Sequence, residues 1–429
     1  MTYQQTLDFL FSQLPAYHRI GKAAYKNDLC NTISLDNYFE NPHLKYPTIH
    51  IGGTNGKGSV SHMIASIFQE AGYKTGLYTS PHLKDFRERI RVDGEMISKK
   101  EVVEFIEVHK GIIESLKPSF FEMTVALAFK YFAEKGVDIA IIEVGMGGRL
   151  DSTNIINPVL SVITNIGHDH MDLLGSTLEM IATEKAGIIK KNVPVVISET
   201  HPVTKEIFIR KAIESDSQIS FADERYLFRK DNIKSQKAEG RYMVTDLVTK
   251  KKFIGKTVLR GEYQSRNIKA VFCVINSLPG AFKFSDKNIS DGIRKVVQNT
   301  GLLGRWQVIG LKPLVICDTG HNKEGLEFVM TQIQEIPKDR LHLIIGFVSD
   351  KDLKSVLTLF PKDATYYFTK ASIPRALNEV TLMEEALRYG LVGKNYPDVK
   401  NALYNARKNA TQSDLIFIGG STFVVAEVI

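Results

Sequence analysis

Apolar residues follow two different periods between Thr48 and about Lys190. Five short runs are almost continuously apolar, as in strands that are buried on both faces of a sheet. These runs are Thr48–Ile51, Thr75–Tyr78, Val137–Val144, Leu160–Thr164 and Val193–Ile197. The stretches between them carry apolar residues at helical spacing, among them Val60, Ile64, Ile67, Phe68 and Ala71. This alternation predicts a parallel sheet covered by helices on both faces, with ligand sites at the carboxyl ends of its strands.

The pattern changes after the predicted sheet. From about Gln218 to Val258 the sequence is alternating and charged, which predicts antiparallel strands attached to the first domain; helices are expected at 264–277 and 290–298. Residues 299–304, with two glycines and no strong pattern, form the predicted linker. Strands alternate with helices again beyond it, at Leu314–Cys317, Leu343–Gly346, Thr365–Phe368 and Leu415–Ile418. We therefore predict a first domain over 1–298 and a smaller α/β domain over 305–429.

Composition narrows the class of protein. The chain has 429 residues, of which 43% are hydrophobic and 24% charged, as in an ordinary globular enzyme. Leu7, Leu10, Phe11 and Leu14 recur at helical spacing, so the N-terminus resembles an amphipathic helix more than a signal peptide. No run approaches the roughly 20 apolar residues of a membrane span. Three scattered cysteines argue against a disulfide scaffold or a zinc module, and favour a reducing cytoplasm.

The formal net charge is +7. Such an excess suits anionic small molecules, and also nucleic acid. Lysines and arginines are dispersed, however, with only short runs such as Lys250–Lys252, and no nucleic-acid module is recognisable. A mildly basic, solvated surface is the simpler interpretation, so we expect neither a nucleic-acid nor a membrane partner.

The sharpest local signal is the segment His50–Ser61, H-I-G-G-T-N-G-K-G-S-V-S, between a predicted strand and a predicted helix. Glycines let main-chain N–H groups turn toward phosphate oxygens, and a helix N-terminus adds partial positive charge. Lys57 supplies a full charge, and the Ser59 hydroxyl can support phosphate or Mg²⁺. The segment departs from G-x-x-x-x-G-K-[ST], because Ile51 replaces the first glycine and Gly58 separates Lys57 from Ser59. The alternative is a glycine-rich turn with an exposed lysine.

Further motifs give this loop a family context. G-T-N-G-K-G-S, in this form, resembles the folylpolyglutamate synthase/dihydrofolate synthase family of the Mur-ligase superfamily. The likeness continues, in family order, through T-S-P-H-L (Thr79–Leu83), E-R-I-R-V-D-G (Glu88–Gly94), G-G-R-L-D-S-T-N (Gly147–Asn154), I-G-H-D-H (Ile166–His170), G-R (Gly304-Arg305) and D-T-G-H-N (Asp318–Asn322). Each motif alone is weak, but together they cover nearly the whole chain.

The resemblance implies a Mur-ligase-like α/β fold: a P-loop domain with a β-rich attachment, followed by a smaller Rossmann-like glutamate-ligase domain. It also implies ATP-dependent ligation of L-glutamate to dihydropteroate, to tetrahydrofolate glutamates, or to both, through an acyl phosphate. The implied cofactors are ATP and Mg²⁺, with two Mg²⁺ sites. The resemblance also implies that the protein is a monomer that acts in folate biosynthesis in the cytoplasm. Another Mur-type amide ligase, or a P-loop kinase or nucleotide switch, remains an alternative.

Metal ligands are expected at the carboxyl ends of the strands. Transfer of a γ-phosphoryl group to a carboxylate brings two anions together and demands cations around them. The resemblance assigns metal roles to Ser80, Glu143 and His170, and a carbamate role to Lys185. The alternatives are a turn at Ser80, a loop cluster or zinc site around His170, and a solvated lysine at 185. A buried structural carboxylate at Glu143 would be awkward, because it needs a cation or donors.

The resemblance assigns the remaining site residues by motif. Phosphate contacts fall on the loop, and adenine contact on Asn267 beside Gln264; helix capping and packing would explain those two amides almost as well. In the second domain it assigns Arg305 and His321 to phosphate and Asp318 to ribose, against a simple Asp–His loop cap. Because ATP would then touch both domains, closure of the second domain is expected. The loop residues meant are Gly53, Thr54, Asn55, Gly56, Lys57, Gly58 and Ser59.

Substrate contacts are the least distinctive. The resemblance places the pterin on Phe121, which could equally be a core residue at helical spacing, and on Asp151. Candidates for glutamate lie in two polar segments with no distinctive spacing. These candidates are Lys370, Ser372, Arg375 and Ser421.

Overall fold

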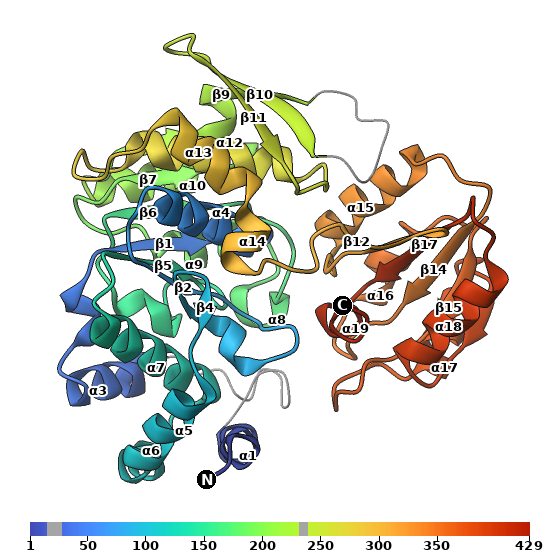
Figure 1. Ribbon diagram of the computed structural model, residues 1–429, viewed down its shortest axis with the longest axis horizontal. Helices are drawn as coiled ribbons and strands as arrows, with labels where there is room; N and C mark the ends of the chain where they lie inside the picture. The colour runs from blue at the N-terminus through green and yellow to red at the C-terminus, as the bar shows by residue number, and fades with distance from the viewer. Residues whose placement is uncertain (15–27, 231–238) are drawn as a thin grey trace. The chain divides into compact units, whose positions relative to one another are not determined.

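The computed structural model describes residues 1–14, 28–230 and 239–429, and these form two compact units (Figure 1). The first unit contains the described residues before 231 together with Glu239–Val258 and Gln264–Leu302. The second contains Leu303–Ile429 and also the short segment Leu259–Tyr263. No helix among the described residues is long and apolar enough to cross a membrane.

The first unit is built on an eight-stranded sheet in the order β4-β3-β2-β5-β1-β6-β7-β8. Its strands are β1 (Thr48–Gly52), β2 (Thr75–Tyr78), β3 (Ile90–Val92), β4 (Glu95–Met96), β5 (Ile139–Glu143), β6 (Leu160–Ile163), β7 (Val195–Ile197) and β8 (Ile219–Phe221). Neighbouring strands from β2 to β8 run parallel, whereas β3 and β4 pair antiparallel at one edge. The five apolar runs thus form the predicted parallel core. Ile219–Phe221, which we expected in the antiparallel attachment, instead extends this sheet beside β7.

Helices cover both faces of this sheet. They are α1 (Tyr3–Gln13), α3 (Cys30–Tyr38), η2 (Pro42–Lys45), α4 (Lys57–Glu70), η3 (Phe86–Arg89), α5 (Lys99–Val108), α6 (Lys110–Leu116), α7 (Phe120–Lys135), η4 (Ser152–Ile155), α8 (Met171–Leu174), α9 (Leu178–Ala186), α10 (Pro202–Glu214), α11 (Ala222–Arg225), α12 (Gln264–Ser277), α13 (Asp286–Arg294) and α14 (Val296–Thr300). Helix α4 packs on β1, β2 and β5, and α12 to α14 pack on α4. The single helix expected at 290–298 was wrong, because the chain there forms α13 and α14, which meet at Lys295.

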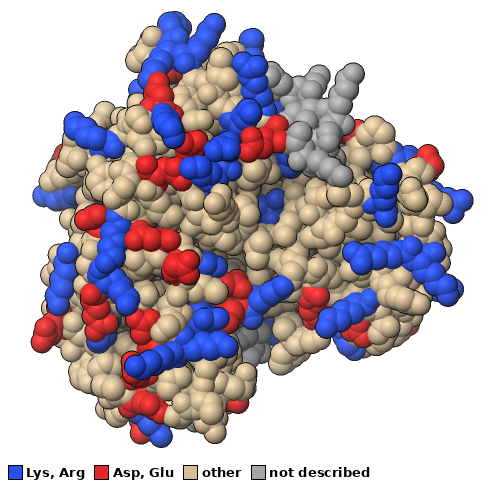
Figure 2. Space-filling view, in the orientation of Figure 1, with Lys and Arg blue, Asp and Glu red and all other residues tan. Residues whose placement is uncertain are grey.

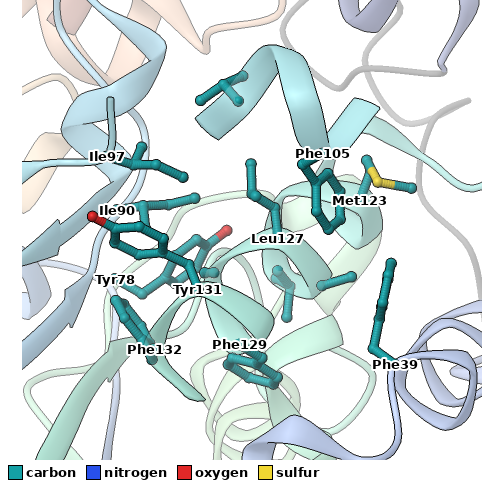
Figure 3. Close-up of a cluster of buried hydrophobic side chains, with 14 of the residues drawn as sticks. Phe39, Tyr78, Ile90, Ile97, Phe105, Met123, Leu127, Phe129, Tyr131 and Phe132 are labelled. Atoms are coloured by element: carbon teal, nitrogen blue, oxygen red, sulfur yellow. The ribbon is translucent and has the colours of Figure 1, made fainter. Parts of the chain in front are cut away.

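Helix α7 anchors the main core on the other side of the sheet. Its side chains Phe129 and Phe132 join Tyr78 of β2 and Ile142 of β5 in one buried cluster (Figure 3). Ser119 caps the helix in a reciprocal capping box with Glu122, which fixes where α7 begins. Phe121, at the second position of α7, lies only partly buried at the margin of this cluster. Phe121 therefore contacts the core without being fully buried in it, so its role as a core residue accounts for only part of its surroundings.

A separate three-stranded antiparallel sheet in the order β11-β10-β9 packs on α12 and α13. It consists of β9 (Tyr226–Lys230), β10 (Gly240–Asp246) and β11 (Lys252–Thr257). Burial alternates strictly along β11, so one face is buried and the other exposes Lys252, Ile254 and Lys256. The antiparallel attachment predicted before Val258 is therefore present.

The second unit is a six-stranded sheet in the order β12-β13-β17-β14-β15-β16, parallel apart from β12. Its strands are β12 (Gln307–Leu311), β13 (Leu314–Cys317), β14 (Leu341–Ile345), β15 (Thr365–Phe368), β16 (Gly393–Asn395) and β17 (Leu415–Gly419). Its helices are α15 (Lys323–Glu335), α16 (Leu353–Leu357), α17 (Glu379–Leu387), α18 (Val399–Asn409) and α19 (Thr422–Ala426). One apolar cluster includes α15 to α17, and a second includes α18 and α19. The predicted strands are all present, and the weakly apolar β12 and β16 are additions.

Candidate active site

The phosphate loop lies between β1 and α4. Gly53 and Gly56 have φ values of +135° and +88°, which L-residues with side chains rarely adopt. Space is equally restrictive, because a Cβ at Gly53 would lie 1.9 Å from Thr164 Oγ1 and one at Gly56 2.4 Å from Asn267 Oδ1. Both glycines are therefore required by the loop that the sequence predicted between a strand and a helix.

The end of β6 holds this loop in place. The Thr54 amide donates to the Asn165 main-chain oxygen at 2.8 Å, and the Asn55 amide donates to Asn165 Oδ1 at 2.7 Å. Thr164 Oγ1 donates to the Asn55 oxygen at 2.6 Å. These contacts were not predicted, although the polar pair directly after an apolar strand was a visible signal. They fix the loop to its neighbouring strand rather than leaving it to glycine alone.

Two lysines converge on one main-chain oxygen of the loop. Lys57 Nζ lies 3.0 Å from the Gly53 oxygen, and Lys185 Nζ, from α9, lies 2.9 Å from the same atom. Lys185 is buried, and its desolvation, reinforced by the charge of Lys57, lowers its pKa to about 7. Lys185 is therefore not the solvated surface lysine that a helical position alone would suggest.

Ser80 and Glu143 meet at the carboxyl ends of neighbouring strands. Ser80 follows β2, Glu143 ends β5, and the Ser80 amide donates to Glu143 Oε2 at 3.0 Å. Glu143 is buried with only 4% of its surface exposed, which requires donors or cations around the carboxylate. His170 lies further along the same edge, where it precedes α8 after β6. The structure thus brings Ser80 and Glu143 into contact and places His170 on the same side of the sheet.

Two amides of α12 contact the phosphate loop. Gln264 Nε2 donates to Ser59 Oγ at 3.2 Å, and Asn267 Nδ2 donates to Gln264 Oε1 at 2.9 Å. Asn267 also lies directly against Gly56, as the close approach of its Oδ1 shows. Both side chains are buried, so they are not exposed caps of α12, whereas the packing interpretation agrees with their contacts.

Phe121 and Asp151 approach the same glycine. A Cβ at Gly145 would lie 2.3 Å from Phe121 Cζ and 3.1 Å from Asp151 Oδ2. Asp151 is buried, and burial raises the pKa of its carboxyl group, while hydrogen bonds from Thr153 and Met146 oppose that rise. The Met146 amide donates to Asp151 Oδ2 at 2.8 Å. The two residues assigned to the pterin by resemblance are therefore neighbours, with an aromatic edge beside a carboxylate.

The second unit holds a cluster around Thr319. Arg305 donates through Nη1 to Thr319 Oγ1, and His321 Nδ1 lies 3.1 Å from the Thr319 oxygen. Asp318 Oδ2 accepts from Tyr263 Oη at 2.6 Å and from the Trp306 amide at 2.7 Å. Burial raises the pKa of Asp318, and these donors oppose the rise. Arg305, Asp318 and His321 thus lie together, and Tyr263 is a fourth member that the sequence did not assign.

The glutamate candidates lie in two places. Ser421 is buried after β17, where its side chain caps α19 by accepting from the Phe423 amide at 3.2 Å. Lys370, Ser372 and Arg375 follow β15, which β14 separates from β17. Arg375 Nη2 forms an ion pair with Asp350 at 2.8 Å, and Lys370 Nζ forms one with Glu379 at 2.9 Å. The Ser372 amide also donates to Glu427 Oε1 at 2.6 Å, at the end of the helix that Ser421 caps, so α19 links the two places.

The donors at the sheet edge suit a hard cation. Among the described residues, no group of three or more His, Cys, Asp or Glu side chains is placed to hold a metal ion. The buried Glu143 carboxylate instead lies against the Ser80 main-chain amide. Mg²⁺ prefers oxygen ligands and retains several waters, so it does not need a complete protein cage. The residues present therefore suit Mg²⁺ better than Zn²⁺, the ion of the zinc site considered as an alternative around His170.

A phosphate loop, buried carboxylate and second α/β unit define a class of nucleotide-dependent enzymes. Two family models match the chain: the Mur ligase middle domain over residues 51–275, and the Mur ligase, glutamate ligase domain over residues 304–422. The chain belongs to the Mur ligase family, in its folylpolyglutamate synthase/dihydrofolate synthase branch. The predicted resemblance, fold class and enzyme class, an amide-forming ligase, are thereby confirmed.

Individual relatives agree with this assignment. The chain is 32% identical over 398 residues to the dihydrofolate synthase/folylpolyglutamate synthase of Bacillus subtilis, covering 90% of each. It is 31% identical over its whole length to a probable bifunctional folylpolyglutamate synthase/dihydropteroate synthase of Haloferax volcanii, of which it spans 50%. The structure of Escherichia coli FolC in complex with DHPP and ADP superposes with a TM-score of 0.85 at 26% identity, covering 100% of this chain and 97% of that one.

Proposed function

We propose that this chain uses ATP to join L-glutamate to the carboxylate of dihydropteroate, of tetrahydrofolate glutamates, or of both. The observation that carries the proposal is the shared location of two sets of residues. The phosphate loop with Lys57, and the Phe121–Asp151 pair, all lie at the carboxyl edge of one parallel sheet. Support also comes from the E. coli relative, whose complex contains DHPP and ADP.

For the nucleotide, we propose that main-chain N–H groups of the loop hold the phosphates and that Asn267 contacts the base. Lys57 is placed at the start of α4, where its ammonium group and the helix N-terminus both offset phosphate charge. In the second unit, the Arg305 guanidinium suits a phosphate, His321 can donate to one, and Asp318 can accept from ribose hydroxyls. Burial of Asp318 and its three hydrogen bonds fix the carboxylate before any ligand arrives.

For the metal, we propose Ser80, Glu143 and His170 as the residues that hold Mg²⁺. The ion would supply charge neutralisation to the transferring phosphoryl group. We further propose that Lys185 is carbamylated and serves a second Mg²⁺, because its buried amine titrates near neutral pH and a carbamate would replace a buried cation by oxygen donors. ¹³C-bicarbonate should then give a carbamate resonance that Lys185→Met lacks and exposed Lys191→Met retains.

The reaction requires two bond exchanges. The acceptor carboxylate attacks the γ-phosphorus, which breaks the bond to ADP and forms an acyl phosphate. The glutamate amine then attacks the acyl carbon, forms the amide and expels phosphate, while the amine loses its proton to solvent. Lys57 and Arg305 offset the charge on the phosphates, and Asp151 and Phe121 orient the acceptor. ¹⁸O placed in the acceptor carboxylate should appear in the released phosphate; phosphate without ¹⁸O would contradict this order.

The glutamate contact is proposed for Ser421 and Arg375. Ser421 is the better placed of the two, since it is buried at a helix N-terminus after a central strand. Arg375 would have to exchange Asp350 for a substrate carboxylate. A raised KM for glutamate in Ser421→Ala, with KM for ATP unchanged, would support this contact.

The setting is proposed on the same basis. We expect a cytoplasmic monomer whose partners are small molecules. The face shown in Figure 2 carries Lys and Arg interspersed with Asp and Glu, rather than one continuous cationic surface.

Product analysis by mass spectrometry tests the central proposal, since each turnover should lengthen the acceptor by one glutamyl residue. Turnover of ATP without a lengthened product would contradict it.

A further inference from the structure

A buried histidine lies behind the proposed acceptor site. His50 belongs to β1, three residues before Gly53, and it is fully buried. Its side chain does not reach toward the phosphate loop that follows. Instead its Nε2 lies 2.9 Å from Thr153 Oγ1, and Thr153 Oγ1 lies 2.5 Å from Asp151 Oδ1. A chain of three side chains therefore links the strand under the loop to the carboxylate assigned to the pterin.

When Asp151 is ionised, the protons in this chain have one consistent arrangement. Burial, with the nearby charge of Lys190, lowers the pKa of His50 to about 3, so the imidazole is neutral. An ionised Asp151 can only accept, so the Thr153 hydroxyl donates to it. The Thr153 oxygen then accepts from His50 Nε2–H. His50 Nδ1 carries no proton, and it has no hydrogen-bond partner among the described residues.

This arrangement fixes the Asp151 carboxylate from one side. Asp151 Oδ1 accepts from both the amide and the hydroxyl of Thr153, at 3.0 and 2.5 Å. Oδ2 then faces Met146 and the backbone of Gly145, where Phe121 also lies. Without His50, the Thr153 hydroxyl would lose the donor that holds its rotamer, and Asp151 Oδ1 would lose a well-directed bond.

A structural role alone does not account for the histidine. The neighbours of His50 on the sheet are Ile142 and Ser161, and its own strand neighbours are isoleucines. An aliphatic residue at this position would avoid the cost of burying an imidazole whose Nδ1 has no partner. The imidazole can donate a hydrogen bond to Thr153 in the chain that leads to Asp151, which an aliphatic side chain cannot do.

We propose that His50 is a positioning residue for the pterin-bearing acceptor, acting through Thr153 on Asp151. This inference rests on the proposed function, because it assumes that Asp151 contacts the acceptor. It makes His50 a determinant of acceptor affinity, although His50 itself touches neither the acceptor nor the nucleotide. Two polar groups buried beneath the site thereby set the orientation of the one carboxylate beside Phe121.

Steady-state kinetics with matched variants tests the proposal. His50→Leu and Thr153→Val remove the chain, whereas His50→Gln keeps a donor near the Nε2 position and Thr153→Ser keeps the hydroxyl. We expect KM for the acceptor that the wild type uses, dihydropteroate or tetrahydrofolate, to rise about 10-fold in the first pair, because the Thr153 bond to Asp151 is weakened or lost. KM for ATP should stay within about twofold, and the second pair should recover most of the affinity. KM for the acceptor in the double variant His50→Leu/Thr153→Val should be no higher than in either single variant.

Several results would overturn the inference. Equal increases in KM for ATP and acceptor would show that His50 only supports β1 and the phosphate loop. Additive effects of the two substitutions would show that they act separately. If His50→Leu does not fold, the comparison of Thr153→Val with Thr153→Ser decides alone. Wild-type protein inactive with both dihydropteroate and tetrahydrofolate would defeat the proposed function, whereas active wild type without a KM difference would defeat only this inference.

Discussion

Lys57 and Lys185 donate to the same atom, the main-chain oxygen of Gly53, at 3.0 and 2.9 Å. One lysine belongs to the phosphate loop, and the other comes from α9, more than 120 residues later in the chain. Their charges oppose each other, which helps to lower the pKa of the buried Lys185 to about 7. Lys57 therefore supplies the positive charge beside the loop, while the charge of Lys185 changes close to pH 7.

The first prediction concerns stability against pH. An unfolded lysine keeps its proton up to about pH 10.5, whereas folded Lys185 releases it near pH 7. Unfolding therefore takes up a proton between these values, so the free energy of unfolding rises with pH by at most about 1.4 kcal/mol per unit. Chemical denaturation from pH 7 to 9, in CO₂-free buffer, should show this rise in wild type and in Lys191→Met but not in Lys185→Met. Parallel profiles for all three proteins would contradict the prediction.

The second prediction concerns Glu143. Glu143→Gln should lower kcat about 100-fold, because it removes the buried negative charge proposed to hold Mg²⁺. The fold should survive, since a glutamine oxygen can still accept from the Ser80 amide. The Mg²⁺ concentration needed for half-maximal rate should rise, and exposed Glu134→Gln should behave as wild type. A Glu143→Gln protein with nearly normal kcat and Mg²⁺ dependence would remove Glu143 from the metal site.

The third prediction concerns the space beside Phe121. Gly145→Ala places a methyl group 2.3 Å from Phe121 Cζ, so the ring must move. We expect KM for the pterin-bearing acceptor to rise about 10-fold, with KM for ATP changed much less. Gly111→Ala is the control, because no atom lies within 4 Å of its added Cβ. Unchanged acceptor kinetics in Gly145→Ala would place the pterin elsewhere.

The fourth prediction concerns Tyr263. Tyr263→Phe removes the 2.6 Å hydrogen bond to Asp318, the residue proposed to accept from ribose. We expect the Kd for ATP to rise about 5-fold, consistent with about 1 kcal/mol for one hydrogen bond. Exposed Tyr404→Phe should have no effect. Calorimetric titration that gives equal Kd values for wild type and Tyr263→Phe would show that this bond does not support nucleotide binding.

Local pattern was sufficient for most of the fold. The apolar runs of β1 and β5 were visible because both faces of those strands are buried. Short edge strands were not predicted. In β16 (Gly393–Asn395), for example, the residues are mostly exposed and carry no apolar signal. The break between α13 and α14 at Lys295 was missed for another reason. Both helices pack on α4, which is distant in sequence, and a local pattern does not contain those contacts.

Motifs supplied the candidate site residues, but contacts between distant segments could not be predicted from them. The ion pair of Arg375 with Asp350 joins residues 25 positions apart and changes what that arginine is free to bind. His50 gave no signal, because a histidine in an apolar strand has no characteristic spacing. Only the folded chain shows that Thr153, 103 residues later, lies against its Nε2. Sequence therefore identified the residue types, and tertiary structure assigned their partners.

The most direct test of the account is Mg²⁺-dependent ADP release by purified protein, measured with and without L-glutamate. Dihydropteroate and tetrahydrofolate should be offered separately as acceptors. We predict ADP release that requires both glutamate and at least one acceptor, and release with both acceptors would identify a bifunctional synthase. ADP release that is independent of glutamate, or no release with either acceptor despite bound ATP, would contradict it.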